Sequence, residues 1–106
     1  MAKGVYLGEF EQIILLALMR LGDDAYGMRV RREIEDRTGR IVTIGAVYAT
    51  LDRLEDKSLV ESTLGEPTVA RGGRAKRTFL VTAEGVAALK QSQEAVERMA
   101  DGVSFA

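Results

Sequence analysis

Apolar residues recur with a helical period near the start of the chain and predict its first helix. The stripe follows spacings of three and four residues and comprises Phe10, Ile13, Ile14, Ala17, Leu18 and Leu21. Gly22 is expected to end this helix. Leu15, Leu16 and Met19 lie off the stripe and are apolar as well. A helix that is apolar on nearly all sides needs cover from more than one side, so we expect a second subunit to supply part of it.

The same period predicts two more helices. Asp23 and Asp24 are suited to cap a helix over residues 25–38, because a carboxylate there accepts hydrogen bonds from free backbone N–H groups. Its apolar side comprises Tyr26, Val30 and Ile34. Residues 41–42 could form only a stub of strand. Thr43 is then expected to cap a third helix, whose inward stripe comprises Ile44, Val47, Leu51 and Leu54.

The period changes to two after the third helix, which predicts strands over residues 60–64 and 78–81. Two helices joined by a short turn, the second followed by a hairpin, are typical of the winged helix-turn-helix. We therefore predict a mainly α fold with a small β-hairpin. Residues 1–82 are expected to form a winged helix-turn-helix DNA-binding domain, and residues 83–106 a C-terminal dimerisation helix.

The third helix presents a candidate surface for nucleic acid. Small outward side chains would let its backbone approach a groove, and polar ones could reach base edges or phosphates. The candidate DNA-binding residues on this helix are Thr43, Ala46, Tyr48, Ala49, Thr50 and Arg53. The ring of Tyr48 is expected to pack half-buried while its hydroxyl meets a phosphate. The alternative is that Arg53 and Lys57 only solvate a surface together with neighbouring acids.

The loop before the second strand concentrates positive charge. The formal net charge of the chain is −1, but residues 40–82 carry more basic than acidic side chains, whereas both flanking segments are net acidic. The candidate wing residues for phosphate contacts are Arg71, Arg74, Lys76 and Arg77. No acid interrupts this run, and neutralising a phosphate releases counterions. The alternative is a solvated hairpin tip that is basic for solubility.

The last helix is expected to be capped by Thr82 and to continue to about Ala100. Apolar residues three and four apart form a heptad seam with one polar position at Gln93. With the apolar excess of the first helix, this seam predicts a homodimer. The candidate dimerisation residues are Leu15, Leu16, Met19, Val86, Leu89, Gln93, Val96 and Ala100. The alternative is an amphipathic helix folded back on its own domain.

Composition removes most enzyme functions. The chain of 106 residues has no Cys and no His, which excludes disulfides, thiolate metal sites, the usual zinc sites and the commonest general base. We therefore predict no enzyme activity, no cofactor and no metal site. The longest apolar run, residues 13–19, is far shorter than the ~20 residues that span a bilayer. We expect a cytoplasmic protein without a membrane partner.

The motifs together resemble the PadR family of bacterial transcriptional regulators. The matching stretches include LGEFEQIILLAL (residues 7–18), DDAYG (23–27), GAVYATLDRLE (45–55), LGEPT (64–68), RGGR (71–74) and VTAEG (81–85). The resemblance implies a winged-helix homodimer that binds near-palindromic operator DNA, usually as a repressor of a nearby operon or of its own gene. It also implies that the third helix enters the major groove, that Tyr48 contacts the DNA backbone, and that the last helix packs against the partner's first helix.

Two departures from the family pattern bear on function. Ser58 stands where the family usually has Gly after the recognition helix, which would be strained if the position is left-handed. The C-terminal part is also a single short helix, as in the compact branch of the family. Some compact relatives bind drugs beside a tryptophan near this helix, but the chain has no Trp, so that aromatic site cannot be carried over. The sequence is still compatible with a pocket for a small-molecule inducer, but it does not indicate which ligand would bind there. The rival function is a winged-helix protein-interaction module that does not bind DNA.

Overall fold

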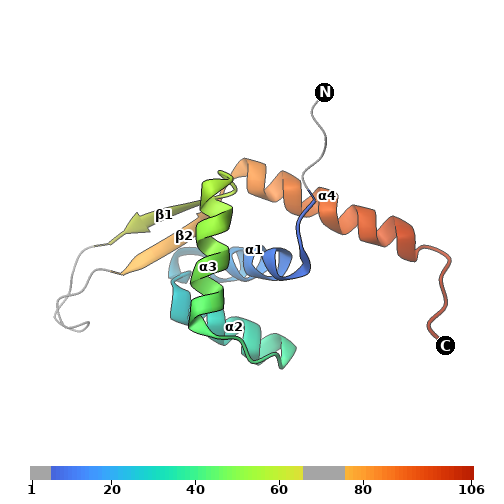
Figure 1. Cartoon of the computed structure of the whole chain (residues 1–106), viewed down its shortest axis with the longest axis horizontal. Coiled ribbons are helices and arrows are strands. Elements are labelled where there is room, and N and C mark those ends of the chain that lie inside the picture. The colour runs from blue at the N-terminus through green and yellow to red at the C-terminus, as the bar shows by residue number, and fades with distance from the viewer. Residues whose placement is uncertain (1–5, 66–75) are drawn as a thin grey trace.

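The computed structural model describes residues 6–65 and 76–106, and shows three helices around one core with a hairpin and a fourth helix extending to opposite sides (Figure 1). The order is α1 (Glu9–Leu21), a 3-10 turn (Gly22–Asp24), α2 (Gly27–Thr38), α3 (Ile44–Asp56), β1 (Val60–Leu64), β2 (Arg77–Val81) and α4 (Ala83–Ala100). The two strands are antiparallel, with Val60 opposite Val81 and Leu64 opposite Arg77. The mainly α fold with a small hairpin is confirmed.

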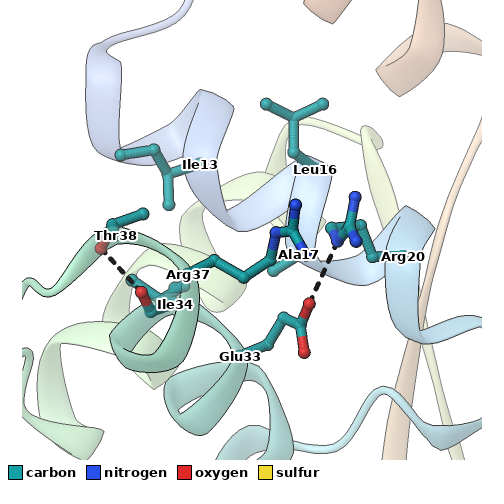
Figure 2. A pocket seen from close by; sticks show the side chains of 8 residues that line it. All are labelled: Ile13, Leu16, Ala17, Arg20, Glu33, Ile34, Arg37 and Thr38. Carbon is teal, nitrogen blue, oxygen red and sulfur yellow. Dashed lines mark hydrogen bonds and ion pairs between the residues drawn. The ribbon is translucent and has the colours of Figure 1, made fainter.

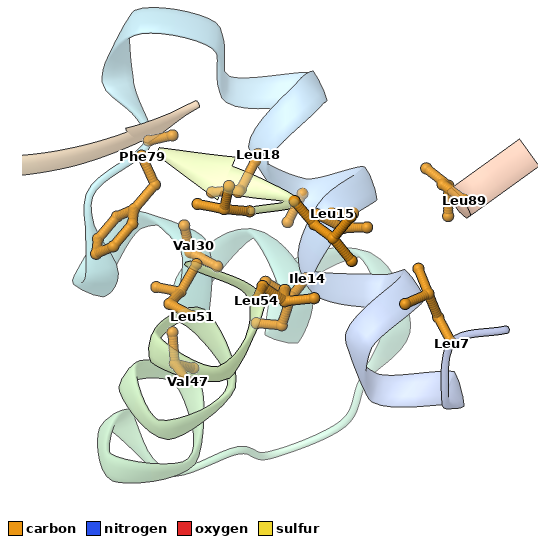
Figure 3. Packing of buried hydrophobic residues seen from close by; sticks show 14 of the residues in the cluster. Leu7, Ile14, Leu15, Leu18, Val30, Val47, Leu51, Leu54, Phe79 and Leu89 are labelled. Carbon is orange, nitrogen blue, oxygen red and sulfur yellow. The ribbon is translucent and has the colours of Figure 1, made fainter. Parts of the chain in front are cut away.

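The core is built from the predicted stripes (Figure 3). Helix α1 contributes Ile14 and Leu18, and α3 contributes its three consecutive inward residues Val47, Leu51 and Leu54. Phe79 on β2 and Leu89 on α4 close the cluster from the other side. Leu15, expected to need a second subunit, is fully buried within its own chain. That expectation is wrong because the hairpin and α4 cover the side of α1 that faces away from α2 and α3.

Two local predictions around α2 are also wrong. Asp23 and Asp24 do not cap α2, because the chain first makes the 3-10 turn and Tyr26 occupies the N-cap without a side-chain hydrogen bond. Asp24 instead forms an ion pair with Arg29, with its Oδ2 3.2 Å from Arg29 Nε. Residues 41–42 form no strand and connect α2 directly to α3.

Threonine caps begin both of the helices for which they were predicted. Thr43 Oγ1 accepts a hydrogen bond from the Ala46 N–H at 3.0 Å, and Thr82 Oγ1 accepts one from the Gly85 N–H at 3.0 Å. The α3–β1 junction lies against the start of α4, since Thr82 Oγ1 also donates to the Ser58 carbonyl at 2.8 Å. A side chain at Gly85 would overlap the Leu59 carbonyl oxygen, so this close approach requires glycine.

Ser58 has a φ of 63°, in the left-handed region. The conditional expectation from the sequence therefore applies, and the position carries a strain on the order of 1 kcal/mol relative to glycine. The strained residue joins α3 to β1, the first strand of the hairpin.

Candidate nucleic-acid interface

The N-terminal half of α3 presents a smooth, uncharged surface. Thr43, Gly45, Ala46 and Ala49 are all exposed, and none of them is larger than threonine. They follow the connection from α2, so they occupy the end of α3 that is farthest from the hairpin junction. Such a surface allows close approach of the helix backbone to a groove.

Thr50 does not face outward as predicted. Thr50 is only 3% exposed and lies at the edge of the buried stripe formed by Val47, Leu51 and Leu54. Its hydroxyl lies 3.4 Å from Arg53 Nη2. Thr50 was expected to face outward because it is polar and lies off the apolar stripe. The buried face of α3 is wider than that stripe and includes Thr50.

Arg53 on α3 and Lys57 at the C-cap of this helix share one carboxylate on α1. Glu11 Oε2 lies 3.0 Å from Lys57 Nζ and 3.9 Å from Arg53 Nε, and Glu11 Oε1 accepts a hydrogen bond from the Gly8 N–H at 3.0 Å. The Glu11 side chain is largely buried. Burial raises the pKa of Glu11, but the Gly8 hydrogen bond and the two cations outweigh it, so the pKa lies below its ordinary value. Arg53 and Lys57 therefore anchor α3 to α1.

Sequence reasoning missed the contact of Glu11 with these cations, whereas it included the outer acids Asp52 and Asp56 in the alternative of a solvated surface. Asp52 and Asp56 lie nearly opposite the buried stripe and are exposed. The outer face of α3 is therefore neutral in its first half and acidic in its second half. Helical spacing from Val47 agrees with this placement, because each acid falls about half a turn from the stripe.

Tyr48 joins three elements behind this surface. Its ring is half-buried, with a centroid 6.4 Å from that of Phe79 on β2 and an angle of 58° between the ring planes. The ring and hydroxyl also occupy the space that a side chain at Gly27 would take at the start of α2. The expected half-buried packing is confirmed, and it places the Tyr48 hydroxyl beside the N-terminus of α2.

The described part of the wing carries two of the four predicted cations. Arg77 Nη2 lies 2.8 Å from Glu55 Oε1 and 3.5 Å from Asp52 Oδ1, and its guanidinium carbon lies 4.8 Å from the centre of the Phe79 ring. Lys76 Nζ lies 4.4 Å from the centre of the Tyr26 ring and 3.7 Å from Asp24 Oδ1. Both wing cations thus contact helix-turn-helix carboxylates. Arg71 and Arg74 lie outside the described residues.

Helix α4 has two halves with different surroundings. In the first half, Leu89 is buried against the core and Ser92 Oγ accepts a hydrogen bond from the Leu7 N–H at 2.9 Å. Leu89 is therefore not free for a partner, which corrects its place in the predicted seam, and Val86 is half-buried. Beyond Ser92 the helix leaves the domain (Figure 1). The exposed apolar residues of this part and of the adjoining tail are Val96, Met99, Ala100, Val103 and Phe105.

The predicted dimerisation residues on α1 also differ among themselves. Leu16 and Met19 are exposed, in contrast to Leu15. Leu16 lies at the edge of a groove of about 250 Å³ between α1 and α2 (Figure 2). The groove floor is apolar, with Ile13 and Ile34, and its rim carries the Arg20–Glu33 ion pair at 3.1 Å. On α4, Gln93 and Val96 are exposed, so the later part of the predicted heptad seam has no contact that buries it.

Residues 6–65 and 76–106 contain no group of three acidic, histidine or cysteine side chains arranged to hold a metal ion. Among the helices of these two segments, none is both long and apolar enough to cross a bilayer.

Comparison with known proteins gives one family. Residues 15–91 match the model of the transcriptional regulator PadR-like family. Among curated proteins, none matches the chain. Among solved structures, the chain is similar to the hsRosR-S1 complex, with 30% identity over 92% of this chain and 79% of the other, and a TM-score of 0.64.

Two further structures are similar over most of both chains. A transcriptional regulator from Clostridium thermocellum has 27% identity, covering 86% of this chain and 85% of its own, with a TM-score of 0.71. A PadR family transcription regulator from Clostridium difficile has 26% identity, covering 89% and 96%, with a TM-score of 0.69.

Proposed function

This chain belongs to the PadR-like family of transcriptional regulators, and on that premise we propose that it is a homodimeric repressor that binds operator DNA. Proteins of this family regulate transcription and are not enzymes. The observation that carries the proposal is the neutral, small-residue face at the N-terminal end of α3, in a chain whose hairpin carries a basic run, because a groove-binding helix needs a close approach and the complex needs phosphate contacts as well.

The N-terminal half of α3 enters the major groove in this proposal. Thr43, Ala46 and Ala49 lie closest to the bases, and their small side chains permit direct contact with base edges or thymine methyl groups. The Tyr48 hydroxyl binds a backbone phosphate beside the N-terminus of α2, where backbone N–H groups favour negative charge. Thr50 is left out of the contact set because it is buried. Arg53 reaches DNA from the rim of α3.

The wing supplies affinity that does not depend on sequence. Arg71, Arg74, Lys76 and Arg77 bind phosphates along the duplex, and each contact releases counterions. This part of the interface is expected to be strongly sensitive to salt. Residues 1–82 thus act as the DNA-binding domain.

The C-terminal half of α4 forms the dimer. Gln93, Val96 and Ala100 pack against the exposed Leu16 and Met19 of a second copy, and this contact covers apolar surface that the single chain leaves in water. The two α3 helices would then be about one DNA turn, ~34 Å, apart. Residues 83–106 act as the dimerisation segment, although the first half of α4 also belongs to the core.

Repression follows from occlusion of polymerase at a nearby operon or at the protein's own gene, in the cytoplasm. A small-molecule inducer would act by changing the dimer geometry, with a coupling of typically ~1–3 kcal/mol.

The test is binding of the purified protein to its own upstream DNA and to random duplex across a salt series. We expect a tighter, dimer-stoichiometric complex with the upstream DNA. If binding equals that of random DNA, selection from random sequences supplies another operator. A selection that enriches nothing contradicts the proposal and favours the protein-interaction module.

A further inference from the structure

We propose that Asp52 and Glu55 hold Arg77 in the free protein at a position where a DNA phosphate replaces them in the complex. The carboxylate pair would thereby reduce binding to DNA of any sequence. The inference rests on the proposed function, since it concerns the wing of the same DNA interface.

The side chains of Asp52, Glu55, Ser62 and Arg77 form one group of contacts, here called the clasp, which joins α3, β1 and β2 at the corner between α3 and the hairpin. Asp52 and Glu55 come from α3, and Arg77 is the first residue of β2. Arg77 Nη2 lies 2.8 Å from Glu55 Oε1, and Glu55 Oε2 accepts a hydrogen bond from Ser62 Oγ on β1 at 2.7 Å. Asp52 Oδ1 lies 3.5 Å from the same Arg77 nitrogen.

The corner is negative although it contains a wing arginine. Two carboxylates surround one guanidinium, and Asp56 lies one turn farther along the outer face of α3. A phosphate that approaches Arg77 is therefore repelled by two charges while it is attracted by one. The neighbouring cation is held similarly, since Lys76 is paired with Asp24. Phosphate binding at this corner requires an exchange of partners.

Such an exchange is feasible because the pair is accessible to solvent. The side chains of Arg77 and Glu55 are 37% and 34% exposed, and ion pairs with this exposure contribute little to stability. A phosphate offers the guanidinium an equally charged partner and releases a counterion from the DNA. The ring of Phe79 supports the guanidinium from one side, so Arg77 can change its acidic partner while it keeps this contact.

The test compares Glu55→Gln with Glu61→Gln as the matched control. Glu61 is on β1, is exposed, and has no ion pair within residues 6–65 and 76–106, so its substitution removes the same charge from the wing without opening the clasp. We expect Glu55→Gln to bind random duplex about two- to fivefold more tightly per subunit than the parent at low salt. Glu61→Gln should give a clearly smaller gain. Asp52→Asn is a second variant, independent of the Ser62 hydrogen bond.

A double-mutant cycle assigns the effect to Arg77. In an Arg77→Gln background, Glu55→Gln should lose its advantage over Glu61→Gln. If Glu55→Gln binds no more tightly than the control, or more weakly than the parent, the clasp does not compete with phosphate and the inference is overturned. A parent that binds no duplex at all removes the proposed function itself, which is a different result from a parent that binds but does not respond to these substitutions.

Discussion

The two ends of the molecule have opposite surfaces. At the corner between α3 and the hairpin, Arg53, Lys57, Lys76 and Arg77 each contact a carboxylate of the same chain. In the second half of α4 and the tail, Val96 is 62% exposed, Met99 80% and Phe105 90%, without apolar cover. The cations of the first surface are paired within one chain, so in the proposed complex a polyanion would have to replace their carboxylate partners. The second surface is incomplete within one chain, and a second copy can complete it.

The largest expected effect comes from placing a charge on the incomplete surface. Val96→Glu should weaken dimerisation by at least about a hundredfold, because an unpaired carboxylate would have to be buried in both copies. Sedimentation should show a monomer at concentrations where the parent is a dimer. Met28→Glu is the control, since Met28 is an exposed apolar residue on α2, away from α4. A dimer that persists in Val96→Glu would exclude this part of α4 from the interface.

The next largest effect concerns the surface with the paired cations. Replacing Arg74 and Arg77 by Ala should weaken binding to operator and random DNA alike, because phosphate contacts carry no sequence information. The slope of log K against log salt should become shallower by about two per subunit. Fluorescence anisotropy across a salt series measures both quantities. Arg53→Ala provides the contrast: a change in discrimination between sites would mean that Arg53 reads a base. Equal binding by the Arg74/Arg77 variant and the parent at every salt concentration would contradict the wing assignment.

Glu11 links the cations of α3 to α1, and its removal should have a moderate effect on stability. Glu11→Gln is expected to cost about 1 kcal/mol in the free energy of unfolding, measured by urea denaturation. The pKa of Glu11 is lowered in the folded chain, so its contribution is present above the ordinary glutamate value of 4.5 and is lost as the pH falls through the folded-state pKa. The stability difference between parent and Glu11→Gln should therefore shrink below pH 4.5. A difference that is constant down to acid unfolding would mean that the charge of Glu11 does not stabilise the fold.

The smallest expected effect is a gain. Ser58→Gly should stabilise the chain by up to about 1 kcal/mol, because glycine adopts the left-handed conformation without strain. Thermal unfolding would show a small rise in Tm. Because the Ser58 carbonyl, not its side chain, accepts the Thr82 hydrogen bond, that contact is kept. A loss of stability would indicate that the serine hydroxyl stabilises the α3–β1 junction.

The elements could be predicted from the sequence because each carries a clear local signal. Period and threonine caps located α3 and α4, and the change to a period of two located β1. The start of α2 was less predictable, since the 3-10 turn at Gly22–Asp24 has the same acidic residues as a helix cap. Local chemistry alone does not distinguish these two uses of Asp24.

The candidate site was harder to predict because its charges act across the fold. Glu11 and Lys57 are far apart in sequence, and only packing of α1 on α3 brings them together. The sequence places Asp52 among the solvated acids of α3 but gives no sign of its contact with Arg77 on β2. Leu15 and Leu89 were assigned to a dimer because an apolar surplus does not show whether its cover comes from the same chain or another.

The contact between Gly27 and Tyr48 restricts how α3 can move relative to α2. The Tyr48 ring fills the space above Gly27 and also lies near Phe79, so α2, α3 and β2 are wedged together by one aromatic side chain. A sliding motion of α3 over α2 would have to expel that ring. In the proposed dimer, α3 would therefore move together with α2 and β2 as one rigid block, and a change in the angle between the two α4 helices would move both blocks on or off adjacent turns of the duplex.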